Sequence, residues 1–563
     1  MVGRSRLCSM RTQSNPTSQG VTFAHPWAFW AGTLSVFLGV AAHMPTFVMS
    51  APMGYQMKDM AMSGVMLGGM GLILLGLALA VYGIVPFGNA AHGVAETTAS
   101  RTFQAMDTAH LTRQHWGLLC VLGVALIVDV MKPATLGFVV PGMRAEYGMT
   151  ARMVALFPLT ALTGTTIGSV MWGLLSDRVG RRAAILLASI LFMATSICGF
   201  MPSFRWNLFM CFIMGISAGG MLPIVYALMT ESMPAHKRGW LVVLHGGLGT
   251  VGGYLLASGL ATLLEPQFSW RILWFAGLPT GLLMLVLNRW IPESPRFLLE
   301  RGRIAEAAEV MRRYGVEIID TQTSELEREP AVRIRPASSL TKIASLFRHP
   351  YLIQTMSVGL YGLGWGLVNW GFITFTPTIL RDRGIDAGGA SKLLFQSALI
   401  AVPATILVAY LYGMWSSRKS MILFALITTA ALIVFAIVDP GGHGHGIGML
   451  MPLMVAVLVG TGGIISMLSP YTAEIYPTAL RGTGSGFAAG SSKIGGMFAP
   501  PVAAALLATS PGFRMIGIIV AIPVALSAML LLFAGVETRD RGLEELTGPS
   551  EVRTALLAEP TNA

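Results

Sequence analysis

Residues 173–182 read GLLSDRVGRR and place four charged side chains between two long apolar runs. Charged residues make up only 12% of the 563-residue chain, so this concentration in ten positions is unusual. The flanking runs, 153–175 and 183–201, are each about as long as a helix that crosses a bilayer. The stretch therefore predicts a charged turn between two membrane-spanning helices.

The composition of the whole chain excludes an ordinary soluble protein. Hydrophobic residues make up 54% of the chain, and the mean hydropathy is +0.66. The apolar runs are continuous, which favours helices because a helix satisfies its own backbone inside lipid. We predict an all-α integral membrane protein with about fourteen transmembrane helices, at 27–50, 63–86, 116–140, 153–175, 183–201, 206–230, 240–264, 271–291, 351–380, 390–414, 420–438, 447–473, 483–508 and 514–535.

The positions of the basic residues predict the orientation of the chain. The formal net charge is +11, and under this topology the cations gather in alternate loops, in the long 292–350 segment and in both tails. Loops rich in Lys and Arg stay on the cytoplasmic side. We therefore expect a multi-pass protein of the cell membrane with both termini in the cytoplasm, and the basic charge needs no nucleic-acid partner. The first apolar run is expected to be retained, because it lacks a convincing cleavage site.

Three pairs of short matches reveal an internal repeat. The nonapeptide ESMPAHKRG at 231–239 returns as EIYPTALRG at 474–482, and both read E-x-x-P-x-x-x-R-G. Two weaker matches follow the same order: GLLSDR at 173–178 with GMWSSR at 413–418, and PESPR at 292–296 with VETRD at 536–540. The similar offsets predict a duplicated six-helix unit, an arrangement known from secondary transporters.

These motifs resemble those of the major facilitator superfamily over roughly residues 115–546. GLLSDRVGRR resembles its signature between the second and third helices, and PESPRFLLERGR and EIYPTALRGTGSG resemble its sugar-porter and metabolite:H⁺ symporter branches. The resemblance implies two six-helix bundles in parallel repeat that rock around a central site, with two extra N-terminal helices. The expected division is a cytoplasmic tail (1–26), an extra two-helix, methionine-rich module with a linker (27–114), an N-terminal bundle (115–291), a cytoplasmic linker (292–350), a C-terminal bundle (351–538) and a cytoplasmic tail (539–563).

The resemblance gives the charged turn a role in closing the cytoplasmic side. Gly173 permits close helix approach, and Gly180 suits a tight turn. By resemblance, Asp177 binds the start of the eleventh core helix when that side is closed, and a helix N-terminus favours a carboxylate by about 0.3–1 kcal/mol. Ser417 stands at the matching position of the second half, so this contact is expected in one half only. Alternatively, these charges only fix the topology.

The same motifs are expected to add a charge network at that face. The two E-x-x-P-x-x-x-R-G elements would pair Glu231 with Arg238 and Glu474 with Arg481. The predicted conformational gate consists of Gly173, Asp177, Arg178, Gly180, Arg181, Glu231, Arg238, Glu474 and Arg481.

Three charged residues lie within predicted membrane helices, where each needs a partner or a water-filled cavity. Asp129 and Lys132 are three residues apart, hence on one helical face. Asp129 matches a position where many proton-coupled members of the superfamily carry Asp, so we predict that Asp129 carries the proton. Lys132 would then help to set the pKa of Asp129 or bind an anionic substrate. Alternatively, the two form a structural ion pair. Lys493 supplies a second positive group, and Cys211 stands where the family often has arginine.

The seventh core helix mixes glycines with aromatic residues in LYGLGWGLVNWGFITFTP. Tyr361, Trp365 and Asn369 follow at four-residue steps with Phe372 close by, which predicts a stacking wall for a flat substrate. Such a stripe is also compatible with simple helix packing. With Lys493, these residues form the predicted substrate-binding set.

The leading interpretation is a secondary transporter that moves a small carboxylate, such as an aromatic acid, together with protons. We expect it to act as a monomer. The alternatives are a carrier of sugars or other metabolites, a copper importer and a membrane sensor with a transporter fold. The copper importer would use His43, His443 and His445 with the methionines at four-residue steps, Met49, Met53, Met57, Met62, Met66 and Met70. The chain has no GxxxxGK[ST] loop and no constellation for catalysis, so we expect neither an enzyme nor a cofactor. The unpaired spacing of its four cysteines indicates neither a disulfide framework nor a zinc site.

Overall fold

The computed structural model describes residues 23–85, 110–316, 339–438, 449–507 and 512–539. Every regular element in these ranges is helical. In chain order the elements are α1 (Pro26–Ala41), α2 (Met44–Met49), η1 (Ala51–Met53), α3 (Gly64–Ile84), α5 (Arg113–Tyr147), α6 (Ala151–Val179), α7 (Arg181–Ala194), η2 (Thr195–Phe200), α8 (Phe204–Ser232), α9 (Ala235–Phe268), α10 (Ile272–Phe275), α11 (Gly277–Leu287), η3 (Asn288–Trp290), α12 (Pro295–Glu300), α13 (Ile304–Arg313), α14 (Ser339–Leu346), α15 (Leu352–Leu367), η4 (Val368–Ile373), α16 (Thr376–Asp382), α17 (Ala387–Tyr410), η5 (Leu411–Trp415), α18 (Ser417–Val438), α19 (Leu450–Ile475), α20 (Thr478–Leu507) and α21 (Gly512–Ala534).

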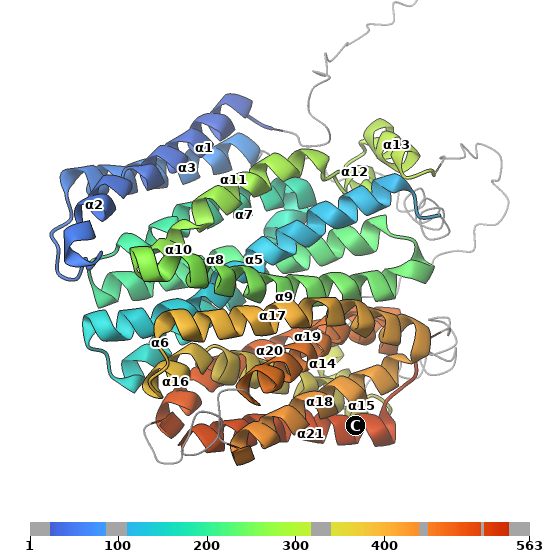
Figure 1. The fold of residues 1–563 in the computed structure, drawn as a ribbon. Coiled ribbons are helices and arrows are strands. Elements are labelled where there is room, and N and C mark those ends of the chain that lie inside the picture. The colour runs from blue at the N-terminus through green and yellow to red at the C-terminus, as the bar shows by residue number, and fades with distance from the viewer. Residues whose placement is uncertain (1–22, 86–109, 317–338, 439–448, 508–511, 540–563) are drawn as a thin grey trace, which may run out of the picture.

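The long helices form two bundles. Helices α5 to α11 build the first bundle and α15 to α21 the second, and the two lie side by side (Figure 1). Successive membrane-crossing segments run in opposite directions (Figure 1). We call the end that carries the turn between α6 and α7 the motif end, and the opposite end, where α5 finishes at Tyr147, the far end.

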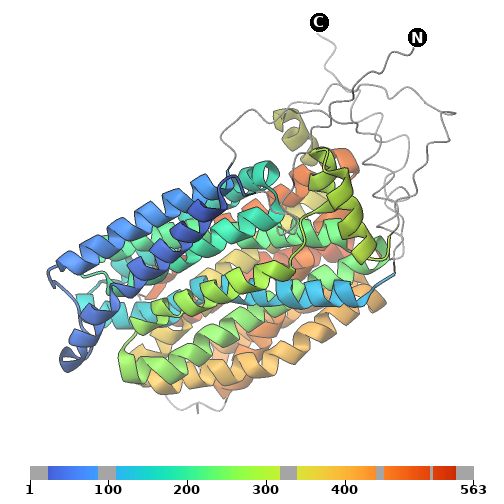
Figure 2. The same cartoon turned by 90° about the horizontal axis from the view of Figure 1, so that it is seen from above.

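The two bundles meet along two seams. Helix α9 of the first bundle packs along α17 of the second, and α6 packs against α20 (Figure 1). Figure 2 shows α12 and α13 gathered at one end of the bundles. The inter-bundle surfaces therefore come from helices that are far apart in the sequence.

Length and hydropathy identify most of these helices as membrane spans. Within the described ranges, twelve helical stretches are long and apolar enough to cross a bilayer. The bundles also contain α15 and α20, which fall outside that set. Helix α15 has 16 residues and continues through the π-helical turn η4 into α16, and α20 carries Arg481 and Lys493. The predicted all-α membrane fold, with two helices outside the repeated bundles, is confirmed.

The two extra helices pack closely against each other through glycines. A side chain at Gly32 or Gly39 of α1 would collide with the backbone of α3 around Gly76 and Gly69. This close contact explains why glycines recur on both helices. The pair lies on the outer side of the first bundle and contacts α7 (Figure 1).

Candidate functional site

The turn at the motif end is built around Gly180 and Glu293. Gly180 has φ 99°, and a Cβ there would collide with the Glu293 carboxylate. Glu293, only 1% exposed, accepts hydrogen bonds from the backbone N–H groups of Arg181 at 2.7 Å and Arg182 at 3.3 Å. A carboxylate at a helix N-terminus satisfies donors that have no partner within the helix. Burial raises the pKa of Glu293, although these backbone hydrogen bonds and Arg181 oppose the shift.

The ion pairs of the first half differ from those expected. Arg181 pairs with Glu231 at 3.0 Å and with Asp177 at 3.3 Å. Arg238, the expected partner of Glu231, donates instead to the Met233 carbonyl oxygen at 2.9 Å. The expected Glu231–Arg238 pair is therefore wrong for this state. Helix α8 ends at Ser232 and α9 begins at Ala235, so Glu231 lies at the end of one helix and Arg238 at the start of the next.

The second half repeats the arrangement with different partners. Glu537 accepts hydrogen bonds from the first backbone N–H of α18, at Ser417, and from the hydroxyls of Ser416 and Ser417. It thus occupies the place that Glu293 has at α7. Glu474 accepts hydrogen bonds from Tyr412 at 2.9 Å and Thr538 at 2.5 Å, and the expected Glu474–Arg481 pair does not form.

Toward the motif end, several glycines of α6 and α20 have open space beside them. A Cβ added to Gly173 would meet no other side chain or neighbouring helix within 4 Å, and the same holds at Gly482, Gly486 and Gly490 of α20. Asp177 has a side chain that is 69% exposed, and its carboxylate pairs with Arg181 of its own turn. Among the residues that the structure describes, Asp177 makes no contact with the start of α20 in this state, and the close approach expected at Gly173 is absent as well. The carbonyl oxygen of Arg178 accepts a hydrogen bond from Arg301 at 2.8 Å.

Asp129 and Lys132 both lie in the interior of the protein, at 5% and 2% exposure. They form no ion pair with each other. The Lys132 ammonium donates to the Phe192 carbonyl oxygen and to Thr195 at 2.5 Å, and it lies 4.1 Å from the centroid of the Phe192 ring. Lys132 is therefore held inside the first bundle by α7 and η2. In the described part of the chain, the Asp129 carboxylate accepts no hydrogen bond.

Lys493 crosses from the second bundle to the first. Its ammonium donates to the hydroxyl of Ser169 and lies 3.5 Å from the carbonyl oxygen of Thr165, both on α6. Its partners are neutral oxygens, and no carboxylate within the described ranges forms an ion pair with it. The structure thus places a half-buried cation without a counter-ion on the seam between the bundles.

The predicted aromatic stripe, which runs from α15 into η4, does not form one wall. Tyr361 and Phe372 are fully buried: Tyr361 donates to the Met421 carbonyl oxygen of α18, and Phe372 packs edge-on against Phe435 of the same helix. Trp365 and Asn369 are only half-buried, and the Trp365 indole N–H has no hydrogen-bond partner. The π-helical turn at Val368–Ile373 adds a residue to the turn and rotates the later side chains away from the spacing of an α-helix.

Two ion pairs between the bundles at the far end were missed by the sequence analysis. Arg144 of α5 pairs with Asp382 of α16 at 3.0 Å, and Glu265 of α9 pairs with Arg381. The partners in the first pair are 238 residues apart. Only the adjacent charges of Arg381 and Asp382, next to an apolar helix, could have drawn attention to this place. We call these two pairs the far-end gate.

The methionine-rich module does not present a continuous column of sulfur ligands. Met49 ends α2, Met53 ends η1, and Met57 follows both, so these three do not share one helix. Met57 is 1% exposed whereas Met49 is 76% exposed. His43 is buried and bonds the Gly39 carbonyl oxygen at 2.8 Å. Among the described residues, no cluster of three or more His, Cys, Asp or Glu could hold a metal, and His443 and His445 lie outside them.

Comparison with known proteins agrees with this architecture. Residues 95–548 match the family described as sugar (and other) transporters. The chain is 25% identical over 439 residues to the niacin transporter NiaP of Acinetobacter baylyi, covering 77% of this chain and 96% of NiaP. It is 24% identical to the 4-hydroxybenzoate transporter PcaK of the same species, covering 76% and 92%.

Solved structures give the fold independently. The xylose transporter XylE from E. coli, in an inward open conformation, matches with a TM-score of 0.60 at 18% identity, covering 77% of this chain and 98% of XylE. The XylE complex with 6-bromo-6-deoxy-D-glucose, described as a major facilitator superfamily proton:xylose symporter, matches with a TM-score of 0.59. The family match spans most of the chain. The protein therefore belongs to the family of sugar (and other) transporters, which are transport proteins and not enzymes, and it shares the fold of the major facilitator superfamily symporter XylE.

Proposed function

We propose that this transporter is a proton-coupled symporter of a small carboxylate, with an aromatic acid as the substrate. The observation that carries the proposal is Lys493, a half-buried cation on the inter-bundle seam whose partners among the described residues are neutral oxygens. A charge at membrane depth is costly unless it is paired or hydrated. A substrate carboxylate would provide the missing counter-ion.

The relatives and the neighbouring side chains support an aromatic body for the substrate. NiaP and PcaK are named as transporters of niacin and 4-hydroxybenzoate, both of which are aromatic acids. Trp365 of α15 and Asn369 of η4 remain half-buried, and both elements pack against α20, the helix of Lys493. An indole with a free N–H and a side-chain amide suit a flat ring that carries polar groups.

Asp129 is the residue that we assign to proton coupling. Its carboxylate is buried, accepts no hydrogen bond in the described part of the chain and forms no ion pair with Lys132. A carboxylate in such surroundings is not held in its ionised form, so binding a proton costs it less free energy than it costs a carboxylate that is fixed in an ion pair. Asp129 would bind the proton that accompanies the substrate.

The two ends of the molecule support alternating access. At the far end, two ion pairs join the bundles, whereas at the motif end Gly173 and the glycines of α20 have open space. We assign this state as closed at the far end. The motif end would face the cytoplasm, consistent with the excess of Lys and Arg at that end. Since both bundles belong to one chain, a monomer would suffice for transport.

The test uses the purified full-length protein in liposomes that contain a pH dye. We expect nicotinate and 4-hydroxybenzoate to drive proton entry beyond the rate in protein-free liposomes, whereas nicotinamide, which has the same ring without the charge, should not. Asp129→Asn should abolish proton entry but retain exchange of labelled substrate across the membrane. Lys493→Met should raise the KM for the acids about 10- to 100-fold, the range expected for loss of a charge-assisted contact.

Lys493→Arg and Ser169→Ala serve as matched variants, because the first keeps the charge and the second removes only its hydroxyl partner. Transport of nicotinamide at the rate of nicotinate, or an unchanged KM in Lys493→Met, would rule out the anion assignment. Proton entry that persists in Asp129→Asn would remove that residue from the coupling.

A further inference from the structure

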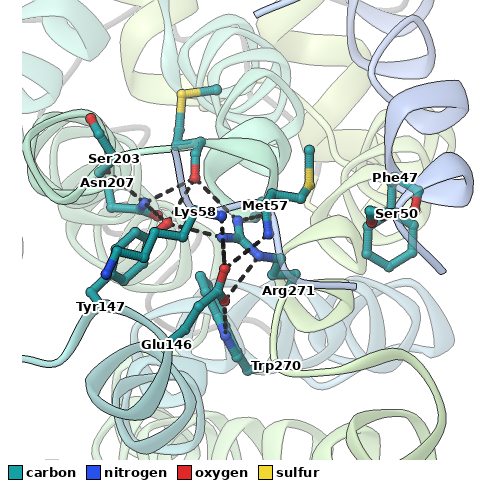
Figure 3. Close-up of polar contacts among 12 residues, drawn as sticks. Phe47, Ser50, Met57, Lys58, Glu146, Tyr147, Ser203, Asn207, Trp270 and Arg271 are labelled. Atoms are coloured by element: carbon teal, nitrogen blue, oxygen red, sulfur yellow. Dashed lines mark hydrogen bonds and ion pairs between the residues drawn. The ribbon is translucent and has the colours of Figure 1, made fainter. Parts of the chain in front are cut away.

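The loop between η1 and α3 of the extra module is bound to the far end of the first bundle. The backbone N–H groups of Met57 and Lys58 donate to one carboxylate oxygen of Glu146, at 2.9 and 3.0 Å (Figure 3). The N–H of Asp59 donates to the Pro202 carbonyl oxygen at 3.0 Å. We call residues 54–63 the far-end loop.

Glu146 is at the same time half of a buried ion pair. Its carboxylate accepts from Arg271 at 2.6 Å and from the Trp270 indole at 3.0 Å (Figure 3). Arg271 is fully buried and directs its other donors to the carbonyl oxygens of Gly199 and Met201 and to the Tyr147 hydroxyl. A buried pair is stable only when its remaining hydrogen-bonding groups are satisfied, and the far-end loop supplies two of the donors to Glu146.

Aromatic contacts attach the same loop to a second helix. Tyr55 packs edge-on against Phe268, the last residue of α9, with ring centroids 5.8 Å apart. Tyr55 also stacks on Phe47, which in turn contacts Phe200. The far-end loop therefore holds the ends of both α5 and α9.

These two helix ends carry the first-bundle partners of the far-end gate. Arg144 lies two residues before Glu146 on α5, and Glu265 lies three residues before Phe268 on α9. Their partners, Asp382 and Arg381, are adjacent at the end of α16. One loop thus fixes both helix ends that meet α16.

We propose that the extra two-helix module regulates the far-end gate, with Glu146 and Tyr55 as positioning residues for Arg144 and Glu265. The module makes the closed far end more stable by holding α5 and α9 in the register that both ion pairs need. This inference rests on the alternating access of the proposed function but not on its substrate, so the two can fail separately.

The test measures opening of the far end in the full-length protein in lipid nanodiscs. A single cysteine is placed at Val154, which lines the cleft beside Arg144 and Asp382, in a background without the native cysteines. The measured quantity is its rate of alkylation by a hydrophilic maleimide. We expect Glu146→Gln and Tyr55→Ala each to raise this rate at least fivefold. Leu74→Ala, on the exposed face of α3, is the matched control and should leave it unchanged.

A double-mutant cycle separates positioning from general destabilisation. In a background that carries Arg144→Ala and Glu265→Gln, the gate is already lost, so Tyr55→Ala should have no additional effect on the alkylation rate. Melting temperatures are recorded for every variant. Equal effects of Tyr55→Ala in both backgrounds, or an unchanged rate in a folded Tyr55→Ala protein, would overturn the proposal.

Discussion

Gly180 is the residue whose backbone allows Glu293 to reach the start of α7. Its φ of 99° is a conformation that other residues rarely adopt, and a Cβ would also collide with the Glu293 carboxylate. We expect Gly180→Ala to lower the free energy of unfolding by about 1–3 kcal/mol. Denaturant unfolding of the purified protein in detergent, followed by tryptophan fluorescence, measures this change.

Gly148 provides the matched control for that substitution. It has φ 63° at the end of α5, but a Cβ there would meet nothing within 4 Å. Gly148→Ala therefore adds backbone strain without a collision and should cost less than Gly180→Ala. Equal costs at the two positions would show that the collision with Glu293 is relieved elsewhere.

At the scale of the helices, α7 and α18 begin in matching ways but with carboxylates in different surroundings. Burial tends to raise the pKa of Glu537, but its hydrogen bonds with Ser416, Ser417 and Arg539 outweigh this and hold the pKa below its ordinary value. The ionised form is therefore favoured by folding. Its stabilising contribution is complete above the unfolded pKa of about 4.3 and is lost as the pH falls through the lower folded pKa.

Glu537→Gln tests the direction of this pH dependence of stability. The substitution should lower stability by about 1 kcal/mol at neutral pH, the effect of a charge at a helix N-terminus, and the difference from the parent should shrink below about pH 4. Glu293→Gln is the counterpart with the opposite trend: because burial raises the pKa of Glu293, the parent should gain relative to the variant as the pH falls. Melting temperatures between pH 3.5 and 7.5 give both trends, and parallel curves would contradict them.

The positions of the helices could be predicted from the sequence, whereas most side-chain contacts between the helices could not. Continuous apolar runs and charged turns were sufficient for the helices, because both depend on local sequence. The side-chain directions along α15 and η4 could not be predicted, because the π-helical turn of η4 changes the periodicity on which the Tyr361–Phe372 stripe depended. The pairs Arg144–Asp382 and Glu146–Arg271 join residues more than 100 positions apart, and no spacing rule reaches that far.

For the whole molecule, the open space beside Gly173 of α6 leads to a prediction about the second state. If the motif end closes during the cycle, a side chain at Gly173 must meet α20, although it meets nothing in this state. Gly173→Leu should therefore fold and bind substrate with near-parental affinity while transport falls at least tenfold. Uptake into liposomes and equilibrium binding to the purified protein separate the two effects.

Val170→Leu is the matched control, since Val170 is one turn away on α6 and 62% exposed. It adds bulk to the same helix without changing a glycine, and it should leave both binding and uptake near the parental values. Normal uptake by Gly173→Leu would mean that the seam does not close at this residue.

The two pairs of the far-end gate differ in how much water reaches them. The side chains of Arg144 and Asp382 are 38% and 54% exposed, whereas those of Arg381 and Glu265 are 22% and 7% exposed. Salt screens exposed charges over about 10 Å at 0.1 M, so dissolved ions weaken the first pair and largely spare the second. An exposed pair contributes at most about 1 kcal/mol, a factor of about five in a two-state ratio. With the far end facing the medium, as proposed above, the same carrier would open that end more readily in brackish surroundings than in fresh water.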